Sequence, residues 1–398
     1  MRKISADYIF PLNHAPVKNG IIIIDENGRV VENVIDPSNP GCSLMDVEHF
    51  DGFICPGFIN THCHLELSYL KGKMREHAGL DNFIVDLQPL RKASIDEEMT
   101  ESALSAENEM KQNGIVAVGD ICNDKSTFSI KNNSSIRFHT FVESFASNPD
   151  KADYVFNKAV ALFNEIRQNV KNNHASITYH APYSISKKLF QKIKEFAESS
   201  GCILSMHHQE SEEENKFFLP RGGHINEMQN SFGVAKSDFA DSGLRPLAAI
   251  SDYIPKENFL QLVHNTVTTD IDIDFAEANF KNLYWCFCPN ANLFIEQKLP
   301  DFALFYNKKC RITIGTDSFA SNKTLSILDE LKTIKANVPY IPLNDLLTWA
   351  SKNGAGFLQI SDTYGTIEKG KQPGILLLEN VNNDTLHISK STTVKVLM

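Results

Sequence analysis

The chain has 398 residues, of which 42% are hydrophobic and 22% are charged, a balance typical of a globular protein with one large core and a smaller second part. Its formal net charge is −10, and no run of Lys and Arg forms a stripe that could neutralise phosphates. We therefore expect neither nucleic acid nor a membrane surface as a partner. A small-molecule substrate fits this composition better.

The first residues, Met1 to Tyr8, lack the apolar core of a signal peptide, and no later run approaches the ~18 apolar residues of a membrane span. We expect a cytoplasmic protein. The eight cysteines, which include Cys42, form no C-x-x-C pair and are interpreted mostly as reduced core thiols. Cys286 and Cys288 could in principle bind a metal, but their apolar setting favours packing within a strand.

The two ends of the chain are predicted to form β-structure. Gly20–Val31 contains two apolar runs about an Asn-Gly turn, which predicts a hairpin, and Gly374–Leu378 predicts a further strand. We expect residues 1–52 and 365–398 to pair into one small β-sandwich domain, with residues 53–364 as the larger domain.

From residue 53 onward, short apolar runs alternate with stretches of helical period, the pattern of β/α units in a parallel sheet. Eight runs are predicted to be strands, namely Phe58–Thr61, Ile115–Gly119, Ile136–Val142, Ser176–Tyr179, Ile203–Met206, Phe259–Val263, Leu283–Cys288 and Arg311–Gly315. Helices between them are predicted at Glu101–Gln112, Asp153–Asn169, Lys187–Ser200 and Leu325–Ala336. Eight such units predict an α/β fold, a (β/α)8 TIM barrel.

Polar residues follow these strands, and in such a barrel the active site is built at the carboxyl ends of the strands. His62 and His64 follow the first strand, and side chains two residues apart in a strand share a face, so the two imidazoles can converge on one point. Histidine also follows three other strands, and Asp317 follows the eighth. Because imidazole is a common metal ligand, we interpret this set as a metal centre rather than as exposed loop histidines.

Four local motifs carry a resemblance to a known family. They are Pro56-Gly57-Phe58-Ile59-Asn60-Thr61-His62-Cys63-His64, His180-Ala181-Pro182-Tyr183-Ser184, His207-His208-Gln209-Glu210 and Gly315-Thr316-Asp317-Ser318. Over essentially its full length the chain resembles the mononuclear aminohydrolase branch of the amidohydrolase superfamily, above all aminodeoxyfutalosine deaminase and methylthioadenosine/S-adenosylhomocysteine deaminase. The resemblance implies a hydrolase that deaminates an adenine-type nucleoside and releases ammonia by way of a metal-bound hydroxide.

The resemblance implies that His62, His64, His207 and Asp317 hold one divalent metal, which lowers the pKa of a bound water toward ~7. His208, which is adjacent to His207, is the alternative candidate for that ligand position. We prefer His207 because Glu210 then completes the family's H-x-x-E motif and because alternation sends His208 to the opposite face. Zinc suits such a set, although iron and manganese also occupy similar sites.

Three residues are expected to act in catalysis. Glu210 would shuttle a proton to the ring nitrogen, or alternatively it merely opens the acidic run Glu210–Glu214 at a helix start. Asp317 would accept a proton from the water. His264 would hydrogen-bond the attacking oxygen or orient Asp317.

The residues implied to bind the substrate are Glu66, Asp81, His180 and Asn292. The usual serine before the second Asn of the subgroup is Ala291 here. The segment Asn215–Phe232, which includes Arg221, is long for a βα loop and is expected either to roof the pocket or to pack on a neighbouring helix.

Two other functions stay open: a guanine deaminase or triazine-type hydrolase, and a barrel that binds without catalysis. The fourth strand ends at His180 and lacks the lysine that bridges two metals in dinuclear relatives, which favours one metal. The oligomeric state is open, and a homodimer is a reasonable expectation.

Overall fold

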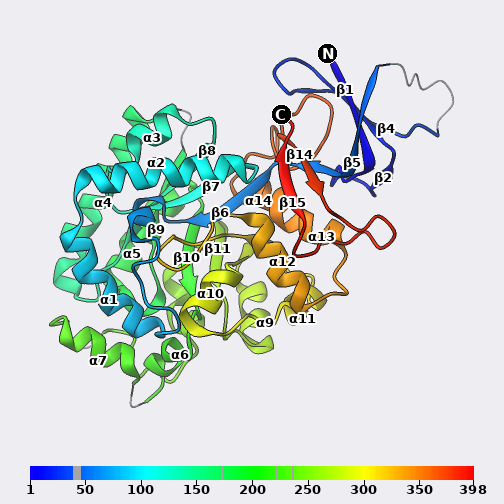
Figure 1. Cartoon of the computed structure of the whole chain (residues 1–398). Coiled ribbons are helices and arrows are strands. Elements are labelled where there is room, and N and C mark those ends of the chain that lie inside the picture. Colours follow the sequence, from blue (N-terminus) through cyan, green and yellow to red (C-terminus); the bar gives the residue numbers. More distant parts are fainter. Residues whose placement is uncertain (39–45, 172–173, 221, 235–236) are drawn as a thin grey trace. The chain divides into compact units, whose positions relative to one another are not determined.

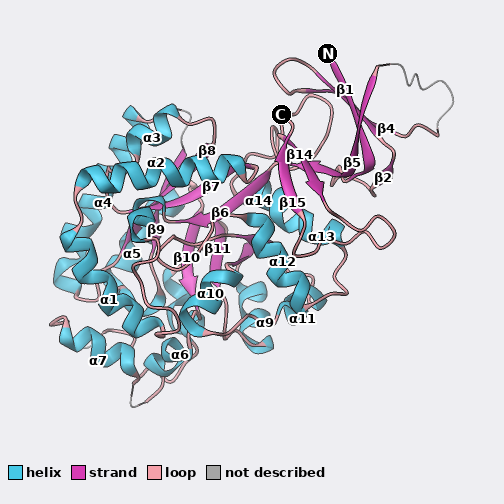
Figure 2. Cartoon of the chain, viewed as in Figure 1, coloured by secondary structure: helices cyan, strands magenta, loops and turns pink. Residues whose placement is uncertain are grey.

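The computed structural model describes residues 1–38, 46–171, 174–220, 222–234 and 237–398, so Cys42 and Arg221 lie outside the described residues. The chain is a mixed α/β protein (Figures 1 and 2). It divides into two compact units, of which the first comprises Met1–Thr61, Asn108–Val118 and Ser326–Met398, and the second His62–Glu107 and Gly119–Leu325.

The first unit contains a seven-stranded sheet that joins the two ends of the chain. Its strands are β1 (Arg2–Ile9), β2 (Val17–Lys18), β3 (Ile21–Ile24), β4 (Val30–Ile35), β5 (Val47–Pro56), β14 (Ile375–Glu379) and β15 (Thr393–Val396), in the order β15-β14-β5-β1-β3-β4 with β2 on β1. The predicted Asn-Gly hairpin joins β3 to β4, and β14 pairs antiparallel with β5. Buried aliphatic side chains such as Ile4, Ile54 and Leu377 form the core of this sheet.

Short helices complete the first unit. They are α12 (Ile327–Asn337), α13 (Leu343–Leu347), a π-helical turn (Thr348–Lys352) and α14 (Asn353–Phe357).

Eight further strands form two four-stranded sheets. They are β6 (Phe58–Cys63), β7 (Ile115–Cys122), β8 (Arg137–Ser144) and β9 (His174–Tyr179) in one sheet, and β10 (Leu204–His208), β11 (Phe259–His264), β12 (Asn282–Phe287) and β13 (Ile312–Ile314) in the other. The β8–β9 pair and all pairs of the second sheet are parallel. Backbone hydrogen bonds also link the sheets, because the His207 N–H donates to the His180 carbonyl over 2.8 Å and the Asp317 N–H to the His62 carbonyl over 3.0 Å.

Helices follow most of these strands. They are α1 (Leu80–Ala93), α2 (Asp96–Gln112), α3 (Phe128–Asn133), α4 (Ala152–Asn169), α5 (Lys187–Ser200), α6 (Glu212–Phe218), α7 (His224–Ser231), α8 (Pro246–Ile250), α9 (Asp270–Asn279), α10 (Pro289–Glu296) and α11 (Phe302–Asn307). Helix α5 has the predicted bounds, and it ends at Gly201 with φ of 65°, a conformation in which glycine carries no steric penalty. Among the described residues, no helix is both long and apolar enough to cross a bilayer.

Several strands extend one to three residues further than the sequence predicts. His62, Asp120, Glu143, His207 and His264 therefore lie in the last residues of strands instead of in the loops that follow. In the second sheet, His208 is the register partner of His264, so the ladder continues to the end of both strands. These polar side chains are thus held by a hydrogen-bonded backbone, which fixes their positions more firmly than a loop would.

Candidate metal and catalytic site

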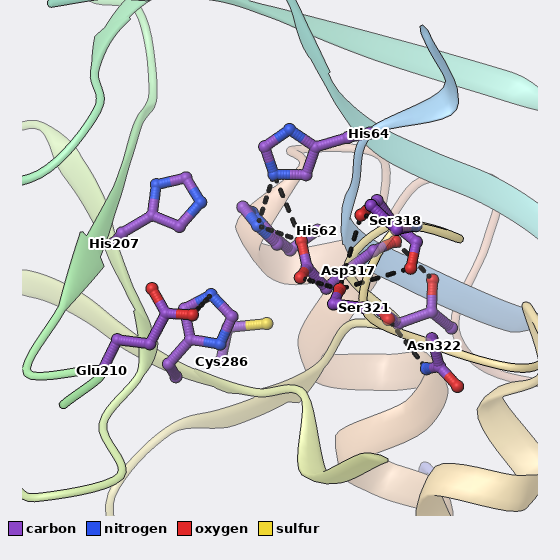
Figure 3. Close-up of polar contacts among 12 residues, drawn as sticks. His62, His64, His207, Glu210, Cys286, Asp317, Ser318, Ser321 and Asn322 are labelled. Carbon is purple, nitrogen blue, oxygen red and sulfur yellow. Dashed lines mark hydrogen bonds and ion pairs between the residues drawn. The ribbon is translucent and has the colours of Figure 1, made fainter. Parts of the chain in front are cut away.

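Four buried side chains meet at the carboxyl ends of the strands. His62, His207, His264 and Asp317 offer ligand atoms that all lie within 4.8 Å of one another. His64 joins them, since its Nε2 lies 3.1 Å from Nε2 of His62 and 3.3 Å from Oδ1 of Asp317. Figure 3 shows His62, His64 and His207 turned toward the Asp317 carboxylate. The strands β6, β10 and β11 and the turn after β13 thus contribute to one centre.

Neighbouring groups hold the outer nitrogens of two of these imidazoles. Nδ1 of His207 lies 2.9 Å from the backbone carbonyl of His180, and Nδ1 of His264 lies 2.8 Å from Oδ1 of Asn292. Each Nδ1 is therefore the donor, which leaves the Nε2 lone pair for the centre. Nε2 of His264 is buried and has no hydrogen-bond partner among the described residues. A buried polar atom without a partner is costly, so this atom fits a ligand or water at the centre.

The charge state of the cluster also suits a cation. Burial lowers the pKa of His64 to about 3 and that of His207 well below its ordinary value, so both imidazoles are neutral at neutral pH. Burial alone would raise the pKa of Asp317, but its contact with His62 and its electrostatic interactions with the imidazoles of His64 and His264 hold that pKa well below its ordinary value. Neutral imidazoles and an ionised carboxylate are the forms that bind metals.

The backbone is strained where it delivers two of these residues. His264 has φ of 75° and Asp317 has φ of 57°, in the left-handed region that costs a non-glycine residue about 1–3 kcal/mol. Such strain persists only where the surroundings impose it, and it concentrates at functional sites. Gly315 permits the close approach of the chain after β13 to β6, because a Cβ there would lie 2.8 Å from Cβ of His62. The Ser321 hydroxyl donates to Asp317 and orients its carboxylate (Figure 3).

Glu210 lies beside this cluster (Figure 3). Its Oε1 is 3.7 Å from Nε2 of His264, and only 5% of the residue is exposed. Burial, with a further contribution from the charge of Asp317, raises the pKa of Glu210 well above its ordinary value. Two other members of the acidic run differ, since Glu212 and Glu213 pair with lysines at the surface, whereas Glu214 is buried like Glu210. Glu210 is therefore buried beside the cluster and is not part of the solvated start of α6.

His208 occupies the opposite face of β10 from His207. Its Nδ1 lies 3.0 Å from Oδ1 of Asn265, and its ring lies 6.2 Å from the ring of Trp285. The alternation of side chains along the strand accounts for this placement.

A cavity of about 530 Å³ opens beside the cluster, and His64 and His180 line it. Nδ1 of His180 lies 2.8 Å from the Ser184 hydroxyl, and its ring lies 4.9 Å from that of His207. The segment Asn215–Phe232 folds into α6 and α7, and its Met228, Gln229 and Phe232 form part of the cavity wall.

The other three residues predicted to bind substrate lie elsewhere. Asn292 stands behind His264, Asp81 faces His224 with 3.5 Å between their polar atoms, and Glu66 accepts hydrogen bonds from Arg91 and from the Asn123 N–H. Glu66 lines a neighbouring cavity of about 620 Å³. None of the three is among the described residues that line the cavity beside the cluster.

Sequence reasoning did not assign a role to Glu143, although it noted this residue as a strand end. Its Oε1 lies 3.6 Å from Nδ1 of His207, and the residue lines the cavity. Burial raises the pKa of Glu143 to about 7. The rule that polar residues at the ends of barrel strands face the active site was the signal that could have found it.

A buried ion pair supports the first strand end. Asp120 accepts the N–H of Leu65, the residue after His64, over 2.8 Å at Oδ1, and its Oδ2 lies 2.6 Å from Nζ of Lys131. Both side chains of the pair are 0% exposed, and Lys131 also donates to the Thr140 hydroxyl over 3.1 Å. Burial alone would lower the pKa of Lys131, but Asp120 raises it above its ordinary value, so the Lys131 ammonium stays charged.

Residues 53–398 match the amidohydrolase family. The chain belongs to this family. The resemblance predicted from the strand-end motifs is thereby confirmed, and so is the general fold that it implies. Metal-dependent hydrolysis is usual in this family.

Known relatives match most of the chain. It is 25% identical over 329 residues to an adenosine deaminase from Helicobacter pylori, a match that covers 80% of this chain and 77% of the relative. Among solved structures, aminofutalosine deaminase from Helicobacter pylori in complex with methylthio-coformycin superposes with a TM-score of 0.81 at 22% identity, covering 96% of this chain and 94% of that one. An adenosine deaminase from Xanthomonas campestris with bound zinc gives a TM-score of 0.76 at 20% identity, covering 97% and 87%.

Proposed function

We propose that this member of the amidohydrolase family is a metal-dependent aminohydrolase that removes the exocyclic amino group of an adenine-type nucleoside as ammonia. The substrate class comprises adenosine, methylthioadenosine, S-adenosylhomocysteine and aminodeoxyfutalosine. The observation that carries the proposal is the buried cluster His62, His207, His264 and Asp317, with Glu210 beside it and a cavity next to it. The names of the relatives, which are deaminases of adenosine-type compounds, support it.

His62, His64, His207 and Asp317 are proposed to hold one divalent ion. The donor set of imidazole nitrogens and a carboxylate suits zinc, which the Xanthomonas campestris structure contains, and it also suits iron or manganese. When bound, such an ion lowers the pKa of a coordinated water toward ~7, so that hydroxide is available at neutral pH.

The residues around the ion divide the proton transfers of the reaction. Asp317 accepts the proton that the attacking water loses, and His264 accepts a hydrogen bond from that water through Nε2. Glu210, whose pKa is raised well above its ordinary value by burial, delivers a proton to the purine ring nitrogen next to the attacked carbon. Collapse of the adduct then breaks the C–N bond. The amino group takes up the proton that Asp317 holds and leaves as ammonia, and the new hydroxyl group gives its proton to Glu210 as it becomes a carbonyl.

The proposed architecture has two domains. Residues 53–364 are proposed to form a closed (β/α)8 barrel, and residues 1–52 with 365–398 a β-sandwich domain. The backbone hydrogen bonds from His207 to His180 and from Asp317 to His62 support closure, because they join the edge strands of the two four-stranded sheets.

An assay of ammonia release tests the function. The metal-loaded protein is given adenine, adenosine, 5′-deoxyadenosine, methylthioadenosine, S-adenosylhomocysteine, aminodeoxyfutalosine, guanine, cytosine and a chlorotriazine. We expect a 5′-substituted adenosine to have a kcat/KM at least ~10-fold above that of adenine, which corresponds to about 1.4 kcal/mol of transition-state binding. Preference for guanine or the triazine would overturn the assignment in favour of those activities, and no turnover of any compound would favour a binding protein.

A further inference from the structure

A second group of metal-binding side chains lies on the seven-stranded sheet of the first unit. Asp7 comes from β1, and His49 and Asp51 come from β5. Each can provide one ligand atom, and these atoms all lie within 4.8 Å of one another. No member of this group belongs to the cluster described above, which lies entirely in the second unit.

A bulge in the pairing of β1 with β5 brings these side chains together. The two strands are parallel, but their register shifts opposite Asp7, which therefore faces two residues of β5, Asp51 and Gly52. Such a bulge changes the direction of the side chains next to it. Gly52 has φ of 125°, and a Cβ there would lie 2.3 Å from a backbone carbonyl oxygen of β14. The bulge therefore depends on glycine at this position.

Neighbouring groups orient the Asp7 carboxylate and the His49 ring. Oδ2 of Asp7 accepts the Gly52 N–H and the side-chain amide of Asn383, each over 2.8 Å. Nδ1 of His49 lies 3.3 Å from the Ser5 hydroxyl. Oδ1 of Asp7 and Nε2 of His49 are left facing each other over 3.7 Å. Metal ligands are commonly held in this way, with their outer atoms bonded to the protein and their inner atoms free.

The distance of 3.7 Å between Oδ1 of Asp7 and Nε2 of His49 suits a shared cation better than a hydrogen bond. An N–H···O hydrogen bond spans about 2.7–3.2 Å. Two ligand atoms that are each about 2.1 Å from one tetrahedral zinc ion lie about 3.4 Å apart. The Asp51 carboxylate, for its part, has no hydrogen-bond or ion-pair partner among the described residues. Two carboxylates so close repel each other, and a cation between them offsets that repulsion.

We propose that Asp7, His49 and Asp51 bind one divalent transition ion such as zinc, which links β1 to β5 at the surface of the sheet. The inference does not rest on the proposed function. One imidazole with two carboxylates suits a transition ion, whereas magnesium and calcium prefer oxygen ligands alone. Because His49 and Asp51 are exposed, water completes the coordination. We therefore expect this ion, unlike one in the buried cluster, to leave during dialysis against metal-free buffer.

Metal content at equilibrium tests the site. The wild-type protein and the variants Asp51→Asn and His49→Gln are dialysed against buffer with micromolar free Zn²⁺, and the metal per chain is measured. We expect each variant to bind about one ion fewer than the wild type. Because only the difference counts, the result does not depend on whether the buried cluster is filled. Asp51→Asn changes an exposed side chain without a described partner, so it should fold like the wild type.

Chemical modification locates the ion. Diethyl pyrocarbonate acylates exposed imidazoles, and a bound metal protects the imidazole that it contacts. With Zn²⁺ at about ten times its Kd, we expect the modification of His49 to slow about 10-fold, as read by peptide mass spectrometry. His14, an exposed histidine outside the group, should react at an unchanged rate, and Mg²⁺ should protect neither residue. The matched controls His14→Gln and Glu26→Gln remove an exposed imidazole and an exposed carboxylate elsewhere, and should keep the wild-type zinc content.

Three results would overturn the inference. Equal zinc content in the wild type and in both ligand variants would mean that the group binds no ion. Equal protection of His14 and His49 would identify the zinc as bound non-specifically at the surface. Protection of His49 by Mg²⁺ as strong as that by Zn²⁺ would exclude a site selective for a transition ion. None of these results bears on the deaminase activity, which the assay of ammonia release tests separately.

Discussion

Replacing Lys131 by Met tests whether the Asp120–Lys131 pair holds the strand end that carries His64. The change removes the ammonium group but keeps much of the apolar stem. It takes away the cation that lies 2.6 Å from the Asp120 carboxylate, at a position where the Asp120 side chain is 0% exposed. Removing one member of a buried ion pair costs about 3–5 kcal/mol, because the remaining charge is uncompensated. We expect the free energy of unfolding to fall by this amount.

Metal affinity should fall as well. Asp120 accepts the N–H of Leu65, and a carboxylate that turns or takes up a proton accepts that bond less strongly. Loss of a supporting hydrogen bond of this kind typically lowers metal affinity by about 10- to 100-fold. Denaturant unfolding of the apoprotein measures the first effect, and competition with a chromophoric chelator measures the second.

Two controls make the test specific. The double variant Asp120→Asn with Lys131→Met removes both charges and should be more stable than Lys131→Met alone. Lys125→Met removes an exposed lysine that pairs with Glu165, a surface pair for which about 1 kcal/mol or less is expected. An unchanged unfolding midpoint and unchanged metal affinity in Lys131→Met would refute the reasoning.

Three further predictions follow from the site. Elemental analysis should find about one divalent metal per wild-type chain, much less in His207→Ala, and the wild-type amount in His208→Ala, while the reverse pattern would assign the ligand to His208. Glu210→Gln should keep its metal but lose ~10²-fold or more in kcat, and near-normal turnover would remove Glu210 from the chemistry. Burial raises the pKa of Glu214 to about 8 from 4.5, so the folded state binds an extra proton between these pH values and the free energy of unfolding falls as the pH rises through this window. The slope is up to about 1.4 kcal/mol per pH unit, and denaturation of Glu214→Gln between pH 5 and 8 should lack it.

The sequence predicted elements well where the local pattern decides them. The apolar face of α5 and the glycine after it place both helix ends correctly, because the signals lie within the helix and its cap. Helix α2 begins at Asp96, five residues before the predicted Glu101. Its first turn is acidic and is stabilised by the helix dipole, whereas the predicted start rested on apolar periodicity.

The sequence could not predict whether a polar side chain near the site would face the cavity or pack behind another residue of the cluster. Asn292 was expected to bind substrate, yet it lies behind His264, since its place depends on how α10 packs. Lys131 and Arg91 were not predicted because each comes from a helix and meets its carboxylate only through tertiary packing. No spacing along the chain encodes such pairs, whereas the spacing of His62 and His64 follows from the geometry of a single strand.

The carbonyl of His62 accepts the N–H groups of both Thr316 and Asp317, so the first and last of the eight strands meet at the histidine and aspartate cluster. Well over half of the chain lies between His62 and Asp317. During synthesis, the amino-terminal part of this cluster leaves the ribosome long before its carboxylate exists, and contacts so distant in sequence form late in folding. Nascent or truncated chains therefore carry the paired histidines without the complete cluster. Tight retention of a metal ion would then report, without any substrate, that a molecule has finished folding.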